Sequence, residues 1–282
     1  MSGGGIVPGF NTYDDKISEG TTGGKLLRWP GHKRFLSATT AGNITNLWDC
    51  GDGDPTAMAT PANAASGGTL HTNEPGTIYW ENKSTDKKFL SYVECKGELA
   101  FELILVDMLW SVSAVSVASV GLRTITSPPT LGRYSGAAAK NVVCFATVTT
   151  ATATTAPIVR LNYEDDTGAT GVVGDNLQFS QAATTVRNAF MLNIARTSRG
   201  VAKVEALDVT TAGSAGEVML TLGRILAVIP CPNANQSNRR SFASPQHKGA
   251  IRIFDGASII PFVYTGGSGT PKIYFDIGVV YG

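Results

Sequence analysis

The chain has 282 residues, and its 23 Lys and Arg against 22 Asp and Glu give a formal net charge of +1. Proteins that hold DNA or RNA need an excess of cations for the phosphates, so this balance argues against a nucleic-acid partner. A hydrophobic fraction of 43% excludes a disordered chain, and 32 glycines beside only 16% charged residues disfavour a helical one.

The first 40 residues are rich in glycine, with isolated apolar side chains between the glycines. Such a segment cannot bury enough apolar surface to offset the entropy lost on ordering. We therefore expect an extended Gly-rich N-terminal arm over residues 1–40 that lies on another polypeptide. The candidate contact residues are Ile6, Val7, Phe10, Ile17 and Trp29.

Residues 41–110 are expected to form a loop-rich β subdomain, with loop and one short helix over residues 44–65. The most apolar stretch, Leu99 to Trp110, is interrupted by Glu102 and Asp107 and is too short to span a bilayer. The N-terminus also lacks the basic and apolar regions of a secretory signal. We expect that the protein does not associate with a membrane. We also expect that it is synthesised in a host cytoplasm.

Residues 111–282 show the period of two that is typical of half-buried strands. It is clearest in 272–279, where one face carries Ile273, Phe275, Ile277 and Val279. Residues 158–163 and 217–222 alternate in the same way, with Met219 and Thr221 on the second face of the latter. Residues 89–93, 142–148 and 225–229 are weaker candidates. Gln181 to Arg196 fits either a helix or a strand over Phe190 to Ile194.

Glycine-rich and Asp-rich turns separate these runs, for example at 165–168, 211–216 and 264–269. The pattern predicts an all-β fold, an antiparallel β-sandwich that is jelly-roll-like, preceded by the N-terminal arm. The expected domains are the arm (1–40), the loop-rich β subdomain (41–110) and the β-sandwich domain (111–282).

Two local motifs resemble ligand sites but fail their spacing tests. Asp49, Asp52 and Asp54 could present oxygens to a hard cation, yet an EF-hand counted from Asp52 has neither its central Gly nor its final Glu. Residues 20–27 resemble a phosphate-binding loop, but the first Gly and the Ser or Thr after Lys25 are missing. The first motif is interpreted as a solvated turn and the second as part of the arm.

The residues needed for nucleophilic catalysis are sparse. His32, His71 and His247 each sit in a polar, turn-rich neighbourhood, which favours surface positions, and no Gly-x-Ser-x-Gly elbow occurs. The four cysteines have no metal-ligand spacing and are interpreted as free thiols. We expect no catalytic residue, no cofactor and no metal, and therefore no enzyme.

The four tryptophans all precede residue 111, and Lys and Arg residues are interleaved with them. Aromatic rings beside cations can stack on sugars, so a carbohydrate site is one interpretation. Anchors of a core or an interface are the commoner role of tryptophans at this density.

Ten segments that follow one another in a characteristic order carry a family resemblance: Leu103–Trp110, Thr124–Thr130, Gly132–Gly136, Val142–Val148, the Thr/Ala tract 149–156, Val159–Tyr163, Thr167–Gly171, Gly200–Val204, Thr210–Gly213 and Leu222–Pro230. Over residues 44–282 this succession resembles a group of virion structural proteins of tailed bacteriophages. The resemblance rests on the order of strands and turns.

The resemblance implies a β-rich subunit on the outer capsid surface of the virion. Its implied function is that of a capsid decoration (cement) protein, which binds and stabilises the lattice of the major capsid protein. A closed ring suits a shell position of local rotational symmetry, so we expect a homo-oligomer, with a trimer favoured and a monomer as the alternative.

Two other functions remain open. A tail, adaptor or vertex/fibre protein that contacts host surface glycans would also be β-rich. A depolymerase would need carboxylates that converge in a groove, which sequence alone does not test.

Overall fold

The computed structural model describes residues 26–35, 39, 41–50, 52–82, 87–152, 155–179, 186–242 and 251–281. Every pairing between its strands is antiparallel, and the only helical elements described are two short 3-10 turns, η1 (Ala64–Ser66) and η2 (Gly136–Ala139). The expected all-β antiparallel class is confirmed.

The strands belong to three sheets. The first contains β1 (Leu26–Arg34), β3 (Gly53–Asp54), β5 (Lys88–Gly97), β15 (Asn238–Ser241), β16 (Arg252–Ile253) and β18 (Lys272–Tyr281). The second contains β2 (Ile44–Asn46), β4 (Thr69–Leu70), β6 (Phe101–Ser116), β8 (Val142–Thr150), β12 (Asn188–Met191), β14 (Glu217–Cys231) and β17 (Ile259–Thr265). The third contains β7 (Gly121–Thr124), β9 (Ile158–Asp165), β10 (Val172–Val173), β11 (Leu177–Gln178) and β13 (Val201–Thr211).

Six strands of the second sheet close into a barrel. Its neighbours run β6, β14, β8, β12, β2 and β17, and β17 pairs again with β6. The barrel is filled by an apolar cluster that includes Val106, Phe145, Met219 and Phe262. The rings of Phe145 and Phe262 lie 4.7 Å apart, so the centre of the molecule is tightly packed.

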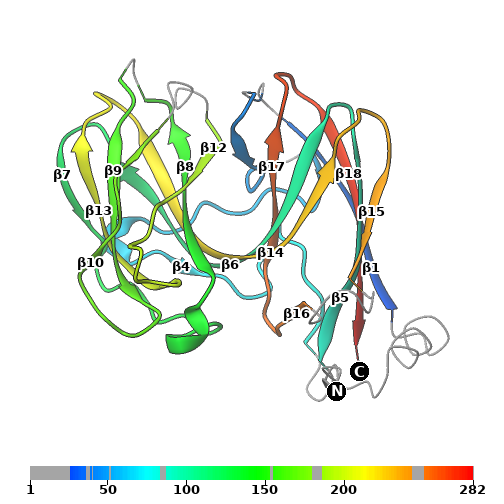
Figure 1. Ribbon diagram of the computed structural model, residues 1–282, viewed down its shortest axis with the longest axis horizontal. Helices are drawn as coiled ribbons and strands as arrows, with labels where there is room; N and C mark the ends of the chain where they lie inside the picture. The colour runs from blue at the N-terminus through cyan, green and yellow to red at the C-terminus, as the bar shows by residue number, and fades with distance from the viewer. Residues whose placement is uncertain are drawn as a thin grey trace.

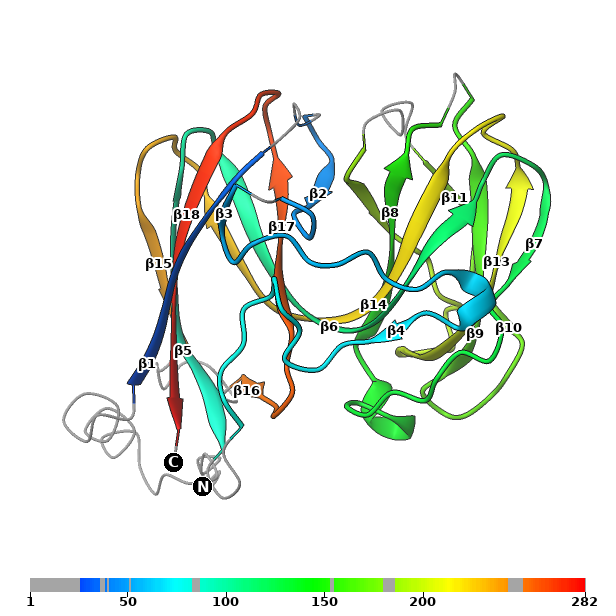
Figure 2. The ribbon, with the colours of Figure 1, turned by 180° about the vertical axis from the view of Figure 1, so that it is seen from behind.

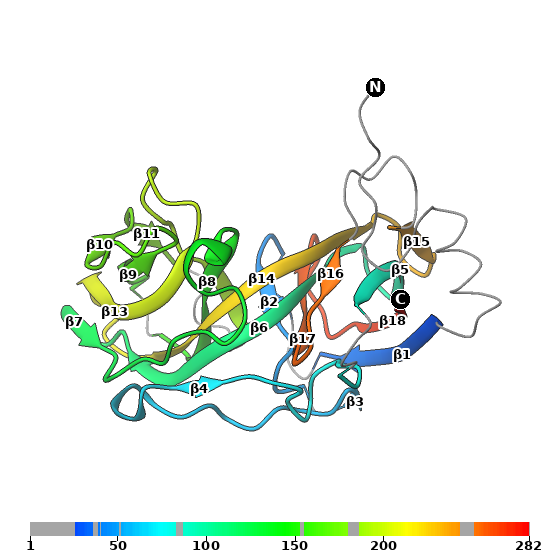
Figure 3. The ribbon, with the colours of Figure 1, turned by 90° about the horizontal axis from the view of Figure 1, so that it is seen from below.

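The strands β6 and β14 run side by side through the whole molecule and connect its two lobes (Figure 3). At one end, outward side chains such as Leu103 join the core under the first sheet. At the other end, outward side chains such as Val112 join the core under the third sheet. Neither strand has a solvent face over most of its length, which explains the almost continuous apolar run in the sequence.

The third sheet covers one half of the barrel and forms the lobe that contains β7, β9 and β13 (Figure 1). In β9 the buried residues Val159, Leu161 and Tyr163 alternate with half-buried ones, as the sequence predicts. The first sheet covers the other half, and Ile273, Phe275, Ile277 and Val279 of β18 face the barrel, also as predicted.

The chain crosses between the lobes twice on the side seen in Figure 2. We call residues 55–80 the crossing segment: it leaves β3, reaches η1 beside the third sheet and returns past β4. It is fastened to β6, since Ser113 donates its hydroxyl to the carbonyl of Pro61 at 2.6 Å and Trp110 donates its indole N–H to Gly67 at 2.9 Å.

The expectation of a half-buried strand at residues 217–222 is wrong for one face. Met219 and Thr221, on the face opposite Leu220, have no exposed surface because they point into the barrel. The ambiguous segment Gln181 to Arg196 contains the strand β12, while residues 181–185 lie outside the described part.

The expected N-terminal arm is too long at its C-terminal end, because residues 26–34 form β1 and pair along their full length with β18. Residues 1–25 lie outside the described part of the chain. The expected boundary between residues 110 and 111 falls inside β6, and this strand is continuous across it.

We expect Phe262→Ala to lower the free energy of unfolding by about 3–5 kcal/mol, because it leaves a cavity inside the barrel against Phe145. Tyr264→Ala is the matched control on the same strand, since the Tyr264 side chain is 38% exposed, and it should cost about 1 kcal/mol or less. Urea denaturation of both variants measures the difference. Equal losses would show that the barrel centre is not a packed core.

Candidate functional site

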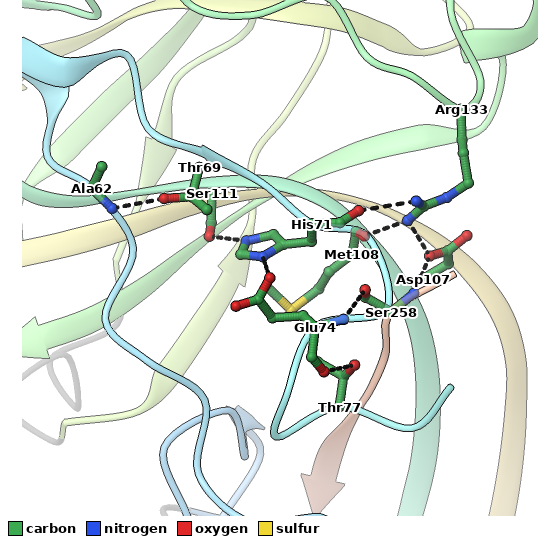
Figure 4. Close-up of polar contacts among 10 residues, drawn as sticks. All are labelled: Ala62, Thr69, His71, Glu74, Thr77, Asp107, Met108, Ser111, Arg133 and Ser258. Carbon is green, nitrogen blue, oxygen red and sulfur yellow. Dashed lines mark hydrogen bonds and ion pairs between the residues drawn. The ribbon is translucent and has the colours of Figure 1, made fainter. Parts of the chain in front are cut away.

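The densest group of chemically active side chains lies at the waist of the molecule, where the crossing segment meets β6. Figure 4 shows its polar contacts. On β6 the outward residues Leu105 and Leu109 join different cores, and Asp107 lies between them. The sequence therefore places a carboxylate between the two cores.

Asp107 is 1% exposed, and its carboxylate is held by two donors. Its Oδ1 accepts a hydrogen bond from Arg133 at 2.9 Å and another from the backbone N–H of Ser258 at 3.1 Å. Burial raises the pKa of Asp107, and the Arg133 guanidinium opposes that rise. The same guanidinium donates to the carbonyls of His71 and Met108 at 2.9 Å, so one cation joins three strands and loops.

His71 and Ser111 form a second contact a few residues away. His71 Nε2 lies 2.6 Å from Ser111 Oγ, and His71 Nδ1 lies 3.7 Å from a carboxylate oxygen of Glu74 (Figure 4). The order serine, histidine, acid is that of a catalytic triad, although the second distance is too long for a hydrogen bond.

The expectation that His71 is a surface residue is wrong, because its side chain is 2% exposed. His71 has polar neighbours in the sequence, but its position in space is set by the strand that precedes it. Thr69 and Leu70 of β4 pair with β6, and this pairing brings His71 against β6. His32 is half-buried in β1, and His247 lies outside the described residues.

Whether the contact between His71 and Ser111 can act in catalysis depends on whether a substrate can reach it. Ser111 has no exposed surface and lies within β6, so a substrate cannot reach its hydroxyl in this conformation. Burial and the nearby Arg133 cation lower the pKa of His71 to about 4. The imidazole is therefore neutral near pH 7 and holds the crossing segment on β6 by a hydrogen bond.

The Asp-rich motif is divided between different partners. Asp49 forms an ion pair with Arg187 at 2.6 Å, so this residue departs from the expected solvated turn. The Asp52 side chain is 48% exposed and lies 3.9 Å from Arg34. Across the described ranges, no group of three or more His, Cys, Asp or Glu side chains is arranged to hold a metal ion.

The aromatic residues belong mainly to the interior. Trp48, Trp80 and Trp110 are buried. Trp29 is half-buried in β1, with its ring 6.3 Å from that of Trp80 and 6.1 Å from that of Tyr79. The other candidate contact residues, Ile6, Val7, Phe10 and Ile17, lie outside the described residues.

All four cysteines are present as thiols, as the sequence predicts, and the structure buries each of them. Within the described part of the chain, no helix is long and apolar enough to cross a membrane. Comparison with protein-family models, with curated proteins and with solved structures found no match.

Sequence reasoning missed Asp107, Arg133 and the contact between His71 and Ser111. One signal could have found part of it: polar residues such as Asp107 and Ser111 interrupt a run that is otherwise apolar on both faces. Buried polar groups need partners, so these positions predict that polar contacts arrive from elsewhere in the chain.

We expect the stability of the protein to fall as the pH drops from about 6.5 to about 4, through His71. The folded chain binds a proton at this residue only near its lowered pKa of about 4, whereas the unfolded chain binds one near the ordinary value of 6.5. The loss is about 3 kcal/mol across that window.

Urea denaturation across a pH series measures this loss, and His71→Gln should lack it. Glu74 and Asp107 have raised pKa values and act in the opposite direction, but both remain in the variant, so the difference isolates His71. His32→Gln is the matched control for the substitution itself, since it makes the same change at a half-buried position of the first sheet. Parallel pH profiles for wild type and His71→Gln would contradict the assignment.

Proposed function

We propose that the protein is a structural component of a bacteriophage particle, a capsid decoration or cement protein that binds and stabilises the lattice of the major capsid protein. The resemblance of residues 44–282 to virion structural proteins provides this function. The structural observation that supports it is the group of buried polar side chains His71, Ser111, Asp107 and Arg133, which are closed to substrate and fasten the crossing segment and the β7–β8 connection to β6.

A decoration protein has to stay rigid while it holds neighbouring shell subunits together. The barrel and its two covering sheets suit that task, because β6 and β14 are paired with each other through both lobes. In this proposal each lobe acts as a β-sandwich, jelly-roll-like, with one wall supplied by the barrel. The protein would act on the outer surface of the virion after synthesis in a host cytoplasm.

The N-terminal arm is proposed as the attachment to the capsid. β1 begins at Leu26, and the proposed contact residues Ile6, Val7, Phe10 and Ile17 precede it in the sequence. The alternative, a tail, adaptor or vertex/fibre protein that binds host glycans, would place the contact on the aromatic side chains instead. Tyr274 is the main candidate for it, with its ring 45% exposed beside Lys272.

Deleting residues 2–24 should leave a folded protein that no longer binds capsids. The deletion removes the proposed contact residues Ile6, Val7 and Phe10 and keeps all of β1. Purified wild-type and truncated proteins would be incubated with undecorated capsids and separated by sedimentation, with circular dichroism to confirm the fold. A triple substitution of Ile6, Val7 and Phe10 by Ser is the full-length control.

Copy number in the particle separates the two functions. Hundreds of copies per virion are expected for a decoration protein, and a dozen or fewer for a tail or vertex protein. Capsid binding by the truncated protein at the wild-type level would overturn the role of the arm. A low copy number together with glycan binding would replace the decoration function by the alternative.

Self-association is proposed to use the edge strand β7. Among the described residues β7 pairs with β13 alone, and Val120 and Leu122 at this edge are 64% and 53% exposed. Arg123 turns back to Ser116 and Ser119, so its charge does not guard the edge. Exposed apolar edges of this kind favour pairing with another chain.

The first sheet contrasts with β7, because its outermost strand on one side is the two-residue β3, which covers part of the neighbouring strand β1. β1 carries Pro30 in its middle and the charged residues Arg28 and Arg34, and both features oppose pairing with a further strand. We therefore place the contact between copies at β7.

Light scattering should give a mass near three times the 29.5 kDa of the chain. Leu122→Lys should shift the mass to that of the monomer, because it puts a charge in the proposed contact. Val173→Lys is the matched control, since Val173 is 43% exposed on β10 at the opposite edge of the same sheet. A monomeric wild type at all concentrations would leave association on the particle as the only form.

A further inference from the structure

Two cysteines that are far apart in the sequence meet in the core under the first sheet. The Sγ atoms of Cys95 on β5 and Cys231 at the end of β14 lie 3.2 Å apart, and each residue is 1% exposed. Cys231 Sγ also donates to the carbonyl oxygen of Cys95 at 3.2 Å. The two thiols are therefore in direct contact between the covering sheet and the barrel.

The position of the pair follows from the strand order. β14 ends at Cys231, the chain turns through residues 232–237, and β15 returns to pair Asn238 with Cys95. The turn is fixed by a hydrogen bond from the N–H of Asn235 to the carbonyl of Gly97 at 2.7 Å. Both cysteines lie in strands, so sheet structure holds their backbones close together.

We propose that Cys95 and Cys231 are a site of reversible oxidation, at which an intramolecular disulfide joins β5 to β14. A disulfide needs the sulfur atoms at about 2.05 Å, so a shift of about 1 Å from the observed contact completes the bond. The oxidant is a small disulfide such as oxidised glutathione.

The reaction proceeds by two thiol exchanges. The thiolate of one cysteine attacks a sulfur of glutathione disulfide, forms a mixed disulfide and releases one glutathione thiolate. The thiolate of the second cysteine then attacks the protein sulfur of that mixed disulfide and releases the second glutathione. Two protein thiols are oxidised and one glutathione disulfide is reduced, and the two protons that the protein thiols lose end on the two released glutathione thiolates.

The surroundings of the pair make the reaction slow and dependent on pH. Burial, followed by the contact with Cys231, raises the pKa of Cys95, so little thiolate exists in the closed structure. Access requires β15 to open, and this four-residue edge strand is mostly exposed and suited to local opening. The rate should therefore rise with pH.

The disulfide would fasten the first sheet to the spine of the barrel and close a loop between residues 136 positions apart. Crosslinks over long loops stabilise mainly by restricting the unfolded chain. This role is independent of the proposed function, because it concerns the stability of one chain. A protein that leaves a reducing cell would gain the bond without a change of fold.

The test treats purified protein with oxidised glutathione at pH 8.5, then denatures it and counts alkylated thiols by mass spectrometry. Wild type should fall from four free thiols to two, and a non-reduced digest should contain the linked peptides of Cys95 and Cys231. Four free thiols after prolonged treatment, or a linkage between other cysteines or between chains, would overturn the proposal.

Two variants and a measurement on the wild type identify the oxidised cysteines, so the test does not depend on the folding of a single variant. Cys231→Ser should retain its three thiols under the same treatment, while Cys144→Ser, a buried thiol of the other core, should lose two of its three. Oxidation of the wild type should also raise its thermal midpoint by roughly 5–10 °C. An unchanged midpoint in protein that mass spectrometry shows to be linked would refute the stabilising role.

Discussion

The pairing of β6 with β14 is the constraint on which the rest of the structure depends. Their paired segments run from Phe101 opposite Cys231 to Ser116 opposite Glu217, and side chains on both faces are buried. Each fully buried aliphatic or aromatic side chain contributes about 1.5–3 kcal/mol, so neither face can be left to water. The inward face of the two strands is buried inside the barrel. The outward face is buried by two separate covering sheets, because the strands are longer than one sheet is wide.

The polar ties at the waist follow from that arrangement. Where the cover passes from one sheet to the other, Asp107 needs partners that neither sheet supplies, and Arg133 and the backbone of Ser258 provide them. Removing Arg133 would leave a buried carboxylate without its cation, which typically costs more than the pair itself contributes. The buried Lys88 is another tie, since it donates to the carbonyls of Trp80 and Glu81 and pairs with Asp255.

How much of this fold could be predicted depends on whether a strand has one buried face or two. β9 and β18 alternate in the sequence because one face meets the core and the other meets solvent or a half-buried surface, and both were predicted at nearly their true positions. β14 has two buried faces, so its alternation does not show which face meets solvent, and the face of Met219 that the sequence predicts to be half-buried lies inside the barrel. Barrel closure was not predictable, since it depends on β17 pairing with β6 across more than 140 residues.

At the waist, the sequence predicts that polar partners are needed but does not predict which residues they are. A strand that is covered on both faces cannot hold Asp107, Ser111 or Ser113 without partners, so their presence in an apolar run already requires polar groups from other segments. Which groups these are depends on contacts between residues that are far apart in the sequence. His71 reaches Ser111 because β4 pairs with β6, and Arg133 reaches Asp107 from the connection between β7 and β8. Neither segment has a local pattern that distinguishes it from a solvent-exposed turn, so the burial of His71 against Ser111 of β6 is visible only in the folded chain.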